Sequence, residues 1–220
     1  MTTSLGDAAT AFVGVPARTQ TYRNLLYLLV AFPLGTAYFV VLTAGLSMGT
    51  GLAITVFGVP ILLATLALAH VLTNVEAVLA NRLLGTDASS ASLNADDGLL
   101  AAAKRLVTAP RTWLGLVLLF GRFVYGIVAL TALTTLVSLS VSMLAAPVTY
   151  STAYHVGLQL GGASVGPFES GTLVVDTFPE AVGVAVAGLA VGVVSLHLLN
   201  GLARVWGVAT EALLGTATTN

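Results

Sequence analysis

The stretch that decides the fold is residues 21–47, TYRNLLYLLVAFPLGTAYFVVLTAGLS. Arg23 and Asn24 are its last strongly polar residues, and residues 25–46 carry no charge. A hydrocarbon layer of about 30 Å, crossed at about 1.5 Å per residue, needs about 20 helical residues. Pro33 is tolerated in such a helix because neighbouring helices can satisfy the carbonyl group that it frees. The stretch therefore predicts a first transmembrane helix over residues 24–46.

Composition indicates the same class for the whole chain. Of its 220 residues, 57% are hydrophobic and only 8% are charged, whereas a soluble domain carries about a quarter charged residues. The net charge of −1 offers no basic field for nucleic acid, so we expect no nucleic-acid partner. The absence of cysteine removes disulfides, thiolate metal sites and cysteine nucleophiles. The sequence predicts an integral membrane protein.

The first stretch recurs later in the chain. Shifted by 91 positions, residues 21–47 fall on residues 112–138, and similar residues coincide. The matched pairs include Leu25 with Leu116, Leu28 with Leu119, Phe32 with Phe123, Gly35 with Gly126, Thr43 with Thr134 and Ser47 with Ser138. The run NRLLGT at 81–86 is echoed by ALLGT at 212–216. We interpret the chain as one helical hairpin that has been duplicated.

Three more spans complete this arrangement. The second is predicted over residues 52–72, with a kink at Gly58 and Pro60, and the fourth over residues 181–199. The third has two registers, 113–137 if the repeat holds and 123–146 if Arg122 marks the interface. Its register depends on that single arginine.

Shorter elements are predicted outside the spans. Residues 73–85 and 201–215 carry apolar stripes at helical spacing and are expected to lie along the inner membrane surface. The stripes are Leu72, Val75, Leu79 and Leu83 in the first, and Leu198, Leu202, Val205, Ala209 and Leu213 in the second. A short amphipathic helix is expected over residues 95–107, and alternation around residues 172–176 suggests a β-hairpin.

The predicted fold is thus an all-α integral membrane protein with four transmembrane helices as two repeated hairpins. Amphipathic interfacial helices and a small extracellular β-hairpin loop are added to them. The expected organisation is a cytoplasmic tail (1–21), a first hairpin (22–86), a cytoplasmic linker (87–108) and a second hairpin (109–220) that includes an outer loop (147–180).

Orientation follows from the basic residues near the spans, which favour the cytoplasmic side. In a four-span arrangement they all fall on one side: Arg18, Arg23, Arg82, Lys104, Arg105, Arg111 and Arg204. The outer loop carries no Lys or Arg. We expect a multi-pass protein of the cell membrane with both termini in the cytoplasm.

Several runs resemble a known family. They are the opening run at 21–43, GVPILL at 58–63, EAVLANRLLG at 76–85 and VDTFPEA at 175–181. Over about residues 17–216 the chain resembles the putative sensor-domain family of haloarchaea and actinobacteria. Its members commonly form the membrane-embedded input module in front of a histidine kinase. The resemblance implies a sensor that passes a membrane or extracellular signal to a cytoplasmic regulator or kinase. Residues 200–220 are too few for a kinase domain, so we expect that partner to be a separate protein.

Arg122 is the most informative charge, because an arginine inside a span usually faces the bundle interior or water. No acidic residue lies within a predicted span, so no ion-pair partner is expected. Arg122 is a candidate contact for a lipid phosphate or an anionic ligand, and the alternative is snorkelling to the cytoplasmic interface. His70 and His197, at the inner ends of spans two and four, are candidates for a pH-sensing pair or for helix-end caps.

The outer loop is the candidate ligand surface. Its candidate residues are Tyr150, Tyr154, His155, Phe168, Glu169 and Asp176. The alternative is a capping loop whose tyrosines lie in the aromatic belt. The irregular spacing of its histidine and carboxylates does not favour a metal site, and no cofactor is expected.

No catalytic motif accompanies these residues, so an enzyme is not predicted. A small transporter or channel subunit is the alternative function, although no polar mid-span residues line a path. Arg82 and Arg204, on the two predicted surface helices, are the candidate partner-binding residues. Membrane lipids are expected partners, and a homo-oligomer is compatible with the sequence.

Overall fold

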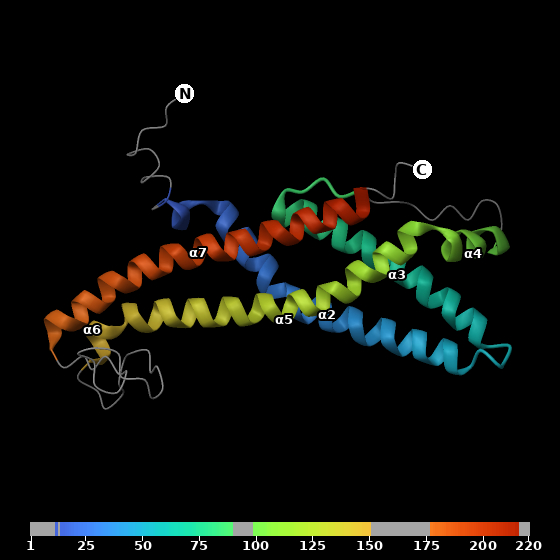
Figure 1. Ribbon diagram of the computed structural model, residues 1–220, viewed down its shortest axis with the longest axis horizontal. Helices are drawn as coiled ribbons and strands as arrows, with labels where there is room; N and C mark the ends of the chain where they lie inside the picture. Colours follow the sequence, from blue (N-terminus) through green and yellow to red (C-terminus); the bar gives the residue numbers. More distant parts are fainter. Residues whose placement is uncertain (1–11, 13, 90–98, 151–176, 216–220) are drawn as a thin grey trace, which may run out of the picture. The chain divides into compact units, whose positions relative to one another are not determined.

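The structure is a computed structural model that describes residue 12 and residues 14–89, 99–150 and 177–215 (Figure 1). Regular structure within these residues is entirely helical. The elements are η1 (Val15–Ala17), α2 (Thr19–Gly51), α3 (Gly58–Leu84), α4 (Leu99–Thr108), α5 (Pro110–Leu144), α6 (Ala146–Thr149) and α7 (Phe178–Gly215). Among the described helices, α2, α3, α5 and α7 are long and apolar enough to cross a membrane. The predicted all-α class with four such helices is confirmed, whereas the predicted β-hairpin lies in residues outside the described ones.

The long helices extend beyond the predicted spans. Helix α2 runs through Pro33 to Gly51, so the first turn of chain lies at residues 52–57. Gly58 and Pro60 begin α3 and do not kink a helix that has already started. A proline fits the first turn of a helix because the backbone N–H groups there have no intrahelical acceptor. The missing N–H of proline therefore costs no hydrogen bond. Helix α5 spans Pro110–Leu144 and therefore contains both of the predicted registers.

The segments predicted as surface helices, 73–85 and 201–215, continue α3 and α7 to their ends. The faces that these segments bury inside the protein differ from the apolar stripes, which were predicted to face the membrane. Val75, Leu198 and Val205 of those stripes are exposed. The buried residues are Thr73, Glu76, Ala77 and Ala80 on α3, and Leu199, Ala203, Gly207, Thr210 and Leu214 on α7. In lipid there is no gain from hiding large apolar side chains between helices, so small and polar residues take the inside.

The described chain divides into two compact units. The four-helix unit, named for the four long helices that enter it, comprises residues 19–131 and 199–220. The two-helix unit, named for its parts of α5 and α7, comprises residues 1–18 and 132–198. Helices α5 and α7 each contribute one part to each unit. This division does not follow the predicted hairpin boundaries and gives the predicted repeat no support.

Helices α2 and α3 of the four-helix unit pack side by side and antiparallel (Figure 1). Its larger apolar core consists of Tyr38, Leu42, Leu66, Ala69, Leu116 and Leu119. Helices α2 and α5 come together at two glycines. A Cβ atom on Gly35 would lie 2.6 Å from the carbonyl oxygen of Arg122, and one on Gly126 would lie 2.8 Å from that of Ala31. Only glycine permits this approach of two backbones.

The two-helix unit is packed by small residues. A Cβ atom on Gly188 of α7 would lie 2.6 Å from the Cβ of Met143 of α5. The hydroxyl groups of Ser140 and Ser195 lie 3.4 Å apart and are buried. Close helix contact through small residues is the usual packing mode in membranes.

Candidate functional site: a buried ion pair among four helices

Five side chains meet inside the four-helix unit, and we call them the charged cluster. They are Tyr27 of α2, Glu76 of α3, Arg122 and Tyr125 of α5, and Trp206 of α7. Each of the four long helices contributes at least one of them. A change in the position of any of these helices must therefore change the cluster.

An ion pair forms the centre of the charged cluster. Arg122 Nη1 lies 3.2 Å from Glu76 Oε1, and both side chains are fully buried. The hydroxyl group of Tyr27 donates a hydrogen bond of 2.6 Å to the same carboxylate oxygen. A buried charge is costly unless it is paired, and breaking such a pair by removing one partner costs about 3–5 kcal/mol. Removing either charge alone is therefore expected to destabilise the contact between α3 and α5.

Three aromatic rings surround the Arg122 guanidinium. Its central carbon lies 4.1 Å from the centroid of the Tyr27 ring, 5.7 Å from that of Tyr125 and 5.9 Å from that of Trp206. Tyr125 and Trp206 stack with centroids 4.4 Å apart, and Tyr125 donates a hydrogen bond to the carbonyl oxygen of Leu202. The faces of the rings are negative, so they stabilise a cation that has been removed from water.

The polar groups of the charged cluster are only partly satisfied. Among the described residues, no hydrogen-bond acceptor reaches Nε or Nη2 of Arg122 or Nε1 of Trp206. Glu76 Oε2 has no donor within the same part of the chain, and Nη1 of Arg122 contacts Glu76 without the alignment of a hydrogen bond. Each buried polar group left in this way costs about 1–3 kcal/mol. Within the described residues, the charged cluster thus has more N–H donors without an acceptor than oxygen atoms without a donor.

The structure corrects the sequence interpretation of Arg122 in two respects. The arginine does not snorkel, because its side chain is fully buried. It has an acidic partner, Glu76, which lies in the segment 73–85 that was predicted to be a surface helix outside the spans. The expectation of no ion-pair partner was wrong because it considered only acidic residues within the predicted spans. The small residues beside Glu76, Ala77 and Ala80, were the signal for a buried face.

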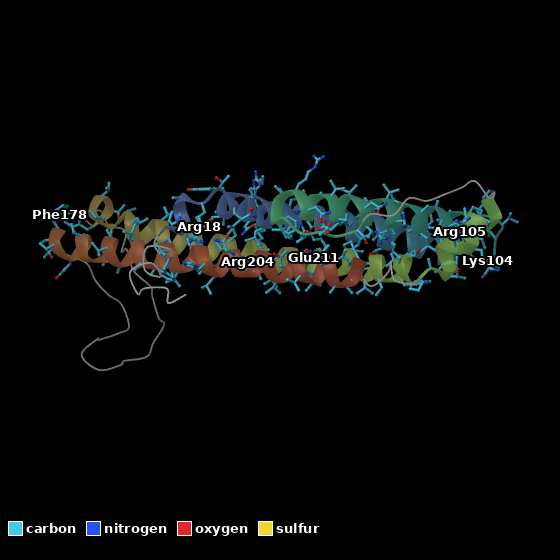
Figure 2. The ribbon with its side chains drawn as sticks, turned by 90° about the horizontal axis from the view of Figure 1, so that it is seen from above. Arg18, Lys104, Arg105, Phe178, Arg204 and Glu211 are labelled. Carbon is cyan, nitrogen blue, oxygen red and sulfur yellow. The ribbon has the colours of Figure 1, made fainter. Side chains whose placement is uncertain are left out.

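None of the other described site residues belongs to the charged cluster. Arg82 and Arg204 are exposed, and Figure 2 shows Arg204 and Glu211 on α7. His70 lies in the four-helix unit and His197 in the two-helix unit, so their pairing stays a prediction. The His197 ring stacks on Phe12 at 4.3 Å, and its Nε2 lies 3.1 Å from the Phe12 carbonyl oxygen.

The outer-loop candidates are only partly described. Tyr150 contacts Phe178 edge to face, with ring centroids 5.9 Å apart. Tyr154, His155, Phe168, Glu169 and Asp176 lie outside the described residues. Their role as a ligand surface stays a prediction.

A second polar site was missed from the sequence. Residues 85–89, which we call the linker segment, follow α3 after Gly85 ends it in the left-handed conformation (φ 69°). The backbone N–H of Asp87 donates to Glu211 of α7 at 2.8 Å. The Ser89 hydroxyl group donates to the carbonyl oxygen of Leu214 at 2.9 Å.

Arg111 at the start of α5 completes this site. Its guanidinium donates to the Ser89 carbonyl oxygen at 2.5 Å and to the Leu214 carbonyl oxygen at 3.4 Å. A cation and a hydroxyl group at the last carbonyl groups of α7 cap that helix end. The linker segment therefore connects the ends of α3 and α7 with the start of α5.

Four apolar helices with a charged pair buried among them define a multi-pass membrane protein. A family model described as "Putative sensor" matches residues 27–214, which is most of the chain. The chain belongs to this family. The family points to a non-catalytic role. No curated protein and no solved structure matches the chain.

Proposed function

We propose that this protein is a membrane-embedded signal-input module that acts on a separate cytoplasmic partner. The observation that carries the proposal is the charged cluster, because its side chains come from all four long helices. A ligand, a lipid or a change in the membrane that favours another helix packing would have to rearrange the Arg122–Glu76 pair. The family assignment supports a sensor over a transporter.

The contacts around the linker segment support a route from the cluster to the partner. Glu76 is followed on α3 by the exposed Arg82 and then by the linker segment. The linker segment is bonded to Glu211 and Leu214 at the end of α7, the helix that carries Trp206 and the exposed Arg204. A shift of α3 relative to α7 would therefore displace Arg82 and Arg204, the proposed partner-binding residues.

Two finer features belong to this proposal. We propose that the two hairpins are repeats although the division into units does not follow them, because their matched glycines occupy reciprocal places. A Cβ atom on Gly35 would meet Arg122 and Phe123, and one on Gly126, 91 positions later, would meet Ala31 and Phe32. The termini and the linker are cytoplasmic, which the one-sided basic residues support. Single cysteines introduced at Ser90 and Ser164 test the orientation, because the natural chain has none. An impermeant thiol reagent applied to whole cells should label Ser164→Cys and spare Ser90→Cys, and the reverse pattern overturns the orientation.

The experiment that tests the function is capture of the partner from native membranes, followed by its identification. We expect a soluble regulator or kinase. Reversing the charge at both exposed arginines, Arg82→Glu with Arg204→Glu, should abolish that capture. Insertion and the thermal stability of the purified protein should be unchanged, because exposed sites tolerate substitution within about 0.5 kcal/mol.

The matched control carries the same charge change elsewhere. Arg23 and Lys104 are also exposed, and Lys104 lies on α4 (Figure 2). Arg23→Glu with Lys104→Glu should leave capture intact. Undiminished capture by the Arg82/Arg204 variant, or equal loss with the control variant, would contradict the proposed output surface. Capture of membrane subunits alone would favour the transporter.

A further inference from the structure

We propose that the free edge of the Arg122 guanidinium is a binding site for a phosphate group. This inference rests on the proposed function and names the chemistry of its signal. Glu76 contacts Nη1 of Arg122, whereas Nε and Nη2 have no acceptor among the described residues. Nε and Nη2 form the side of a guanidinium that presents two parallel N–H groups. That side binds phosphate or carboxylate oxygens in pairs.

A third donor lies in the same cluster. Trp206 Nε1 is buried and has no acceptor in the part of the chain that the structure describes, and the Trp206 ring centroid lies 5.9 Å from the Arg122 guanidinium carbon. The unsatisfied donors therefore come from α5 and α7. A group that supplies several acceptor oxygens would satisfy these N–H donors. A phosphate group carries such oxygens on a single phosphorus atom.

Entry of such a group must move a helix. Arg122 is fully buried, and a Cβ atom on Gly121 would lie only 3.3 Å from the Trp206 ring, so α5 and α7 are closely packed here. Binding would part Trp206 from Arg122 and shift the part of α7 that carries Arg204. Binding would in this way produce the displacement that the proposed function requires.

Glu76 opposes the same binding, so removing its charge should raise the affinity for phosphate. Its carboxylate lies 3.2 Å from Arg122, so a second anion at the guanidinium is repelled by it. Glu76→Gln removes that charge and keeps the size of the side chain. A structural role of the pair alone predicts weaker packing in this variant, whereas the proposed site predicts tighter phosphate binding.

The test uses Trp206 as a reporter. The chain has two tryptophans, so Trp113→Phe leaves Trp206 as the only indole. The whole 220-residue chain in a phosphate-free detergent is titrated with mixed micelles of phosphatidic acid, with micelles of diacylglycerol and with inorganic phosphate. We expect saturable quenching or shift of Trp206 fluorescence with phosphatidic acid and no response to diacylglycerol, which lacks the phosphate. A matching response to inorganic phosphate identifies a free anion as the source, and its absence identifies a lipid headgroup.

Three further variants complete the design. Glu76→Gln should bind on the order of tenfold more tightly, and Arg122→Lys on the order of tenfold more weakly because it lacks the paired N–H groups. The double variant Glu76→Gln with Arg122→Gln buries no charge, so it should fold and should not respond.

A response to diacylglycerol equal to that to phosphatidic acid, an unchanged response in the double variant, or no tightening in Glu76→Gln would overturn the inference. The assay needs no partner protein, so its failure is distinct from a failure of partner capture.

Discussion

The two units of the chain are both built from apolar helices, yet they bury different chemistry. The four-helix unit encloses a full ion pair, Arg122 with Glu76, and three aromatic rings around it. In the described part of the two-helix unit, two buried hydroxyl groups, those of Ser140 and Ser195, contact each other. Small residues and hydroxyl contacts of this kind are the usual means of packing helices in a membrane. Buried charge is not needed for that purpose, and charge inside a membrane usually marks function.

The largest expected effect tests the charged side of this comparison. Arg122→Leu leaves Glu76 buried without a cation, so we expect a loss of about 3–5 kcal/mol in the free energy of unfolding. The measurement is reversible unfolding in mixed micelles by titration with a denaturing detergent. Arg204→Leu, at an exposed arginine, is the control and should change stability by less than about 0.5 kcal/mol. Equal effects of the two variants would mean that Arg122 is not buried.

A smaller effect is expected where the backbones of α2 and α5 meet. Gly35→Ala places a methyl group against the carbonyl group of Arg122, so we expect a loss of about 1–3 kcal/mol in the free energy of unfolding. The same titration measures it.

Gly183→Ala is the matched control on α7, because no atom of the described residues, apart from the glycine's own surroundings in the helix backbone, lies within 4 Å of the added Cβ position. It should be neutral or slightly stabilising, since alanine favours a helix more than glycine does. A neutral Gly35→Ala would show that the two helices do not approach each other as described.

The smallest effect belongs to the two-helix unit. Ser195→Ala removes the hydroxyl contact with Ser140, and hydrogen bonds between membrane helices are worth about 0.6 kcal/mol on average. The same detergent titration should show a loss of that order. A loss as large as that of Arg122→Leu would remove the difference between the two units.

The features that could be predicted from the sequence were those that depend on composition and on the length of apolar runs. Residues 25–46 had to form a long membrane helix, and the motifs around them pointed to the family that the chain belongs to. The sequence also identified Arg122 as a candidate functional residue, because an arginine inside a membrane span is costly and usually functional.

The partner of Arg122 could not be predicted by the rule used for helix faces. That rule turns the apolar side of a helix toward the membrane and its polar side toward water. It placed Leu72 and Val75 against the membrane interface and Glu76 on the side that faces water, whereas the structure buries Glu76 inside the protein. The contacts of Ser89 and Glu211 were invisible for another reason, since they join residues more than 120 positions apart.

The central claim is that Arg122 and Glu76 act as one buried pair, and a double-mutant cycle tests it most directly. Free energies of unfolding are measured for the natural protein, Arg122→Gln, Glu76→Gln and the double variant. Arg122→Gln should lose about 3–5 kcal/mol, and adding Glu76→Gln should restore most of that loss, because no unpaired charge then remains. Losses that add to within about 0.5 kcal/mol would contradict the account, since they would show that the two side chains are independent.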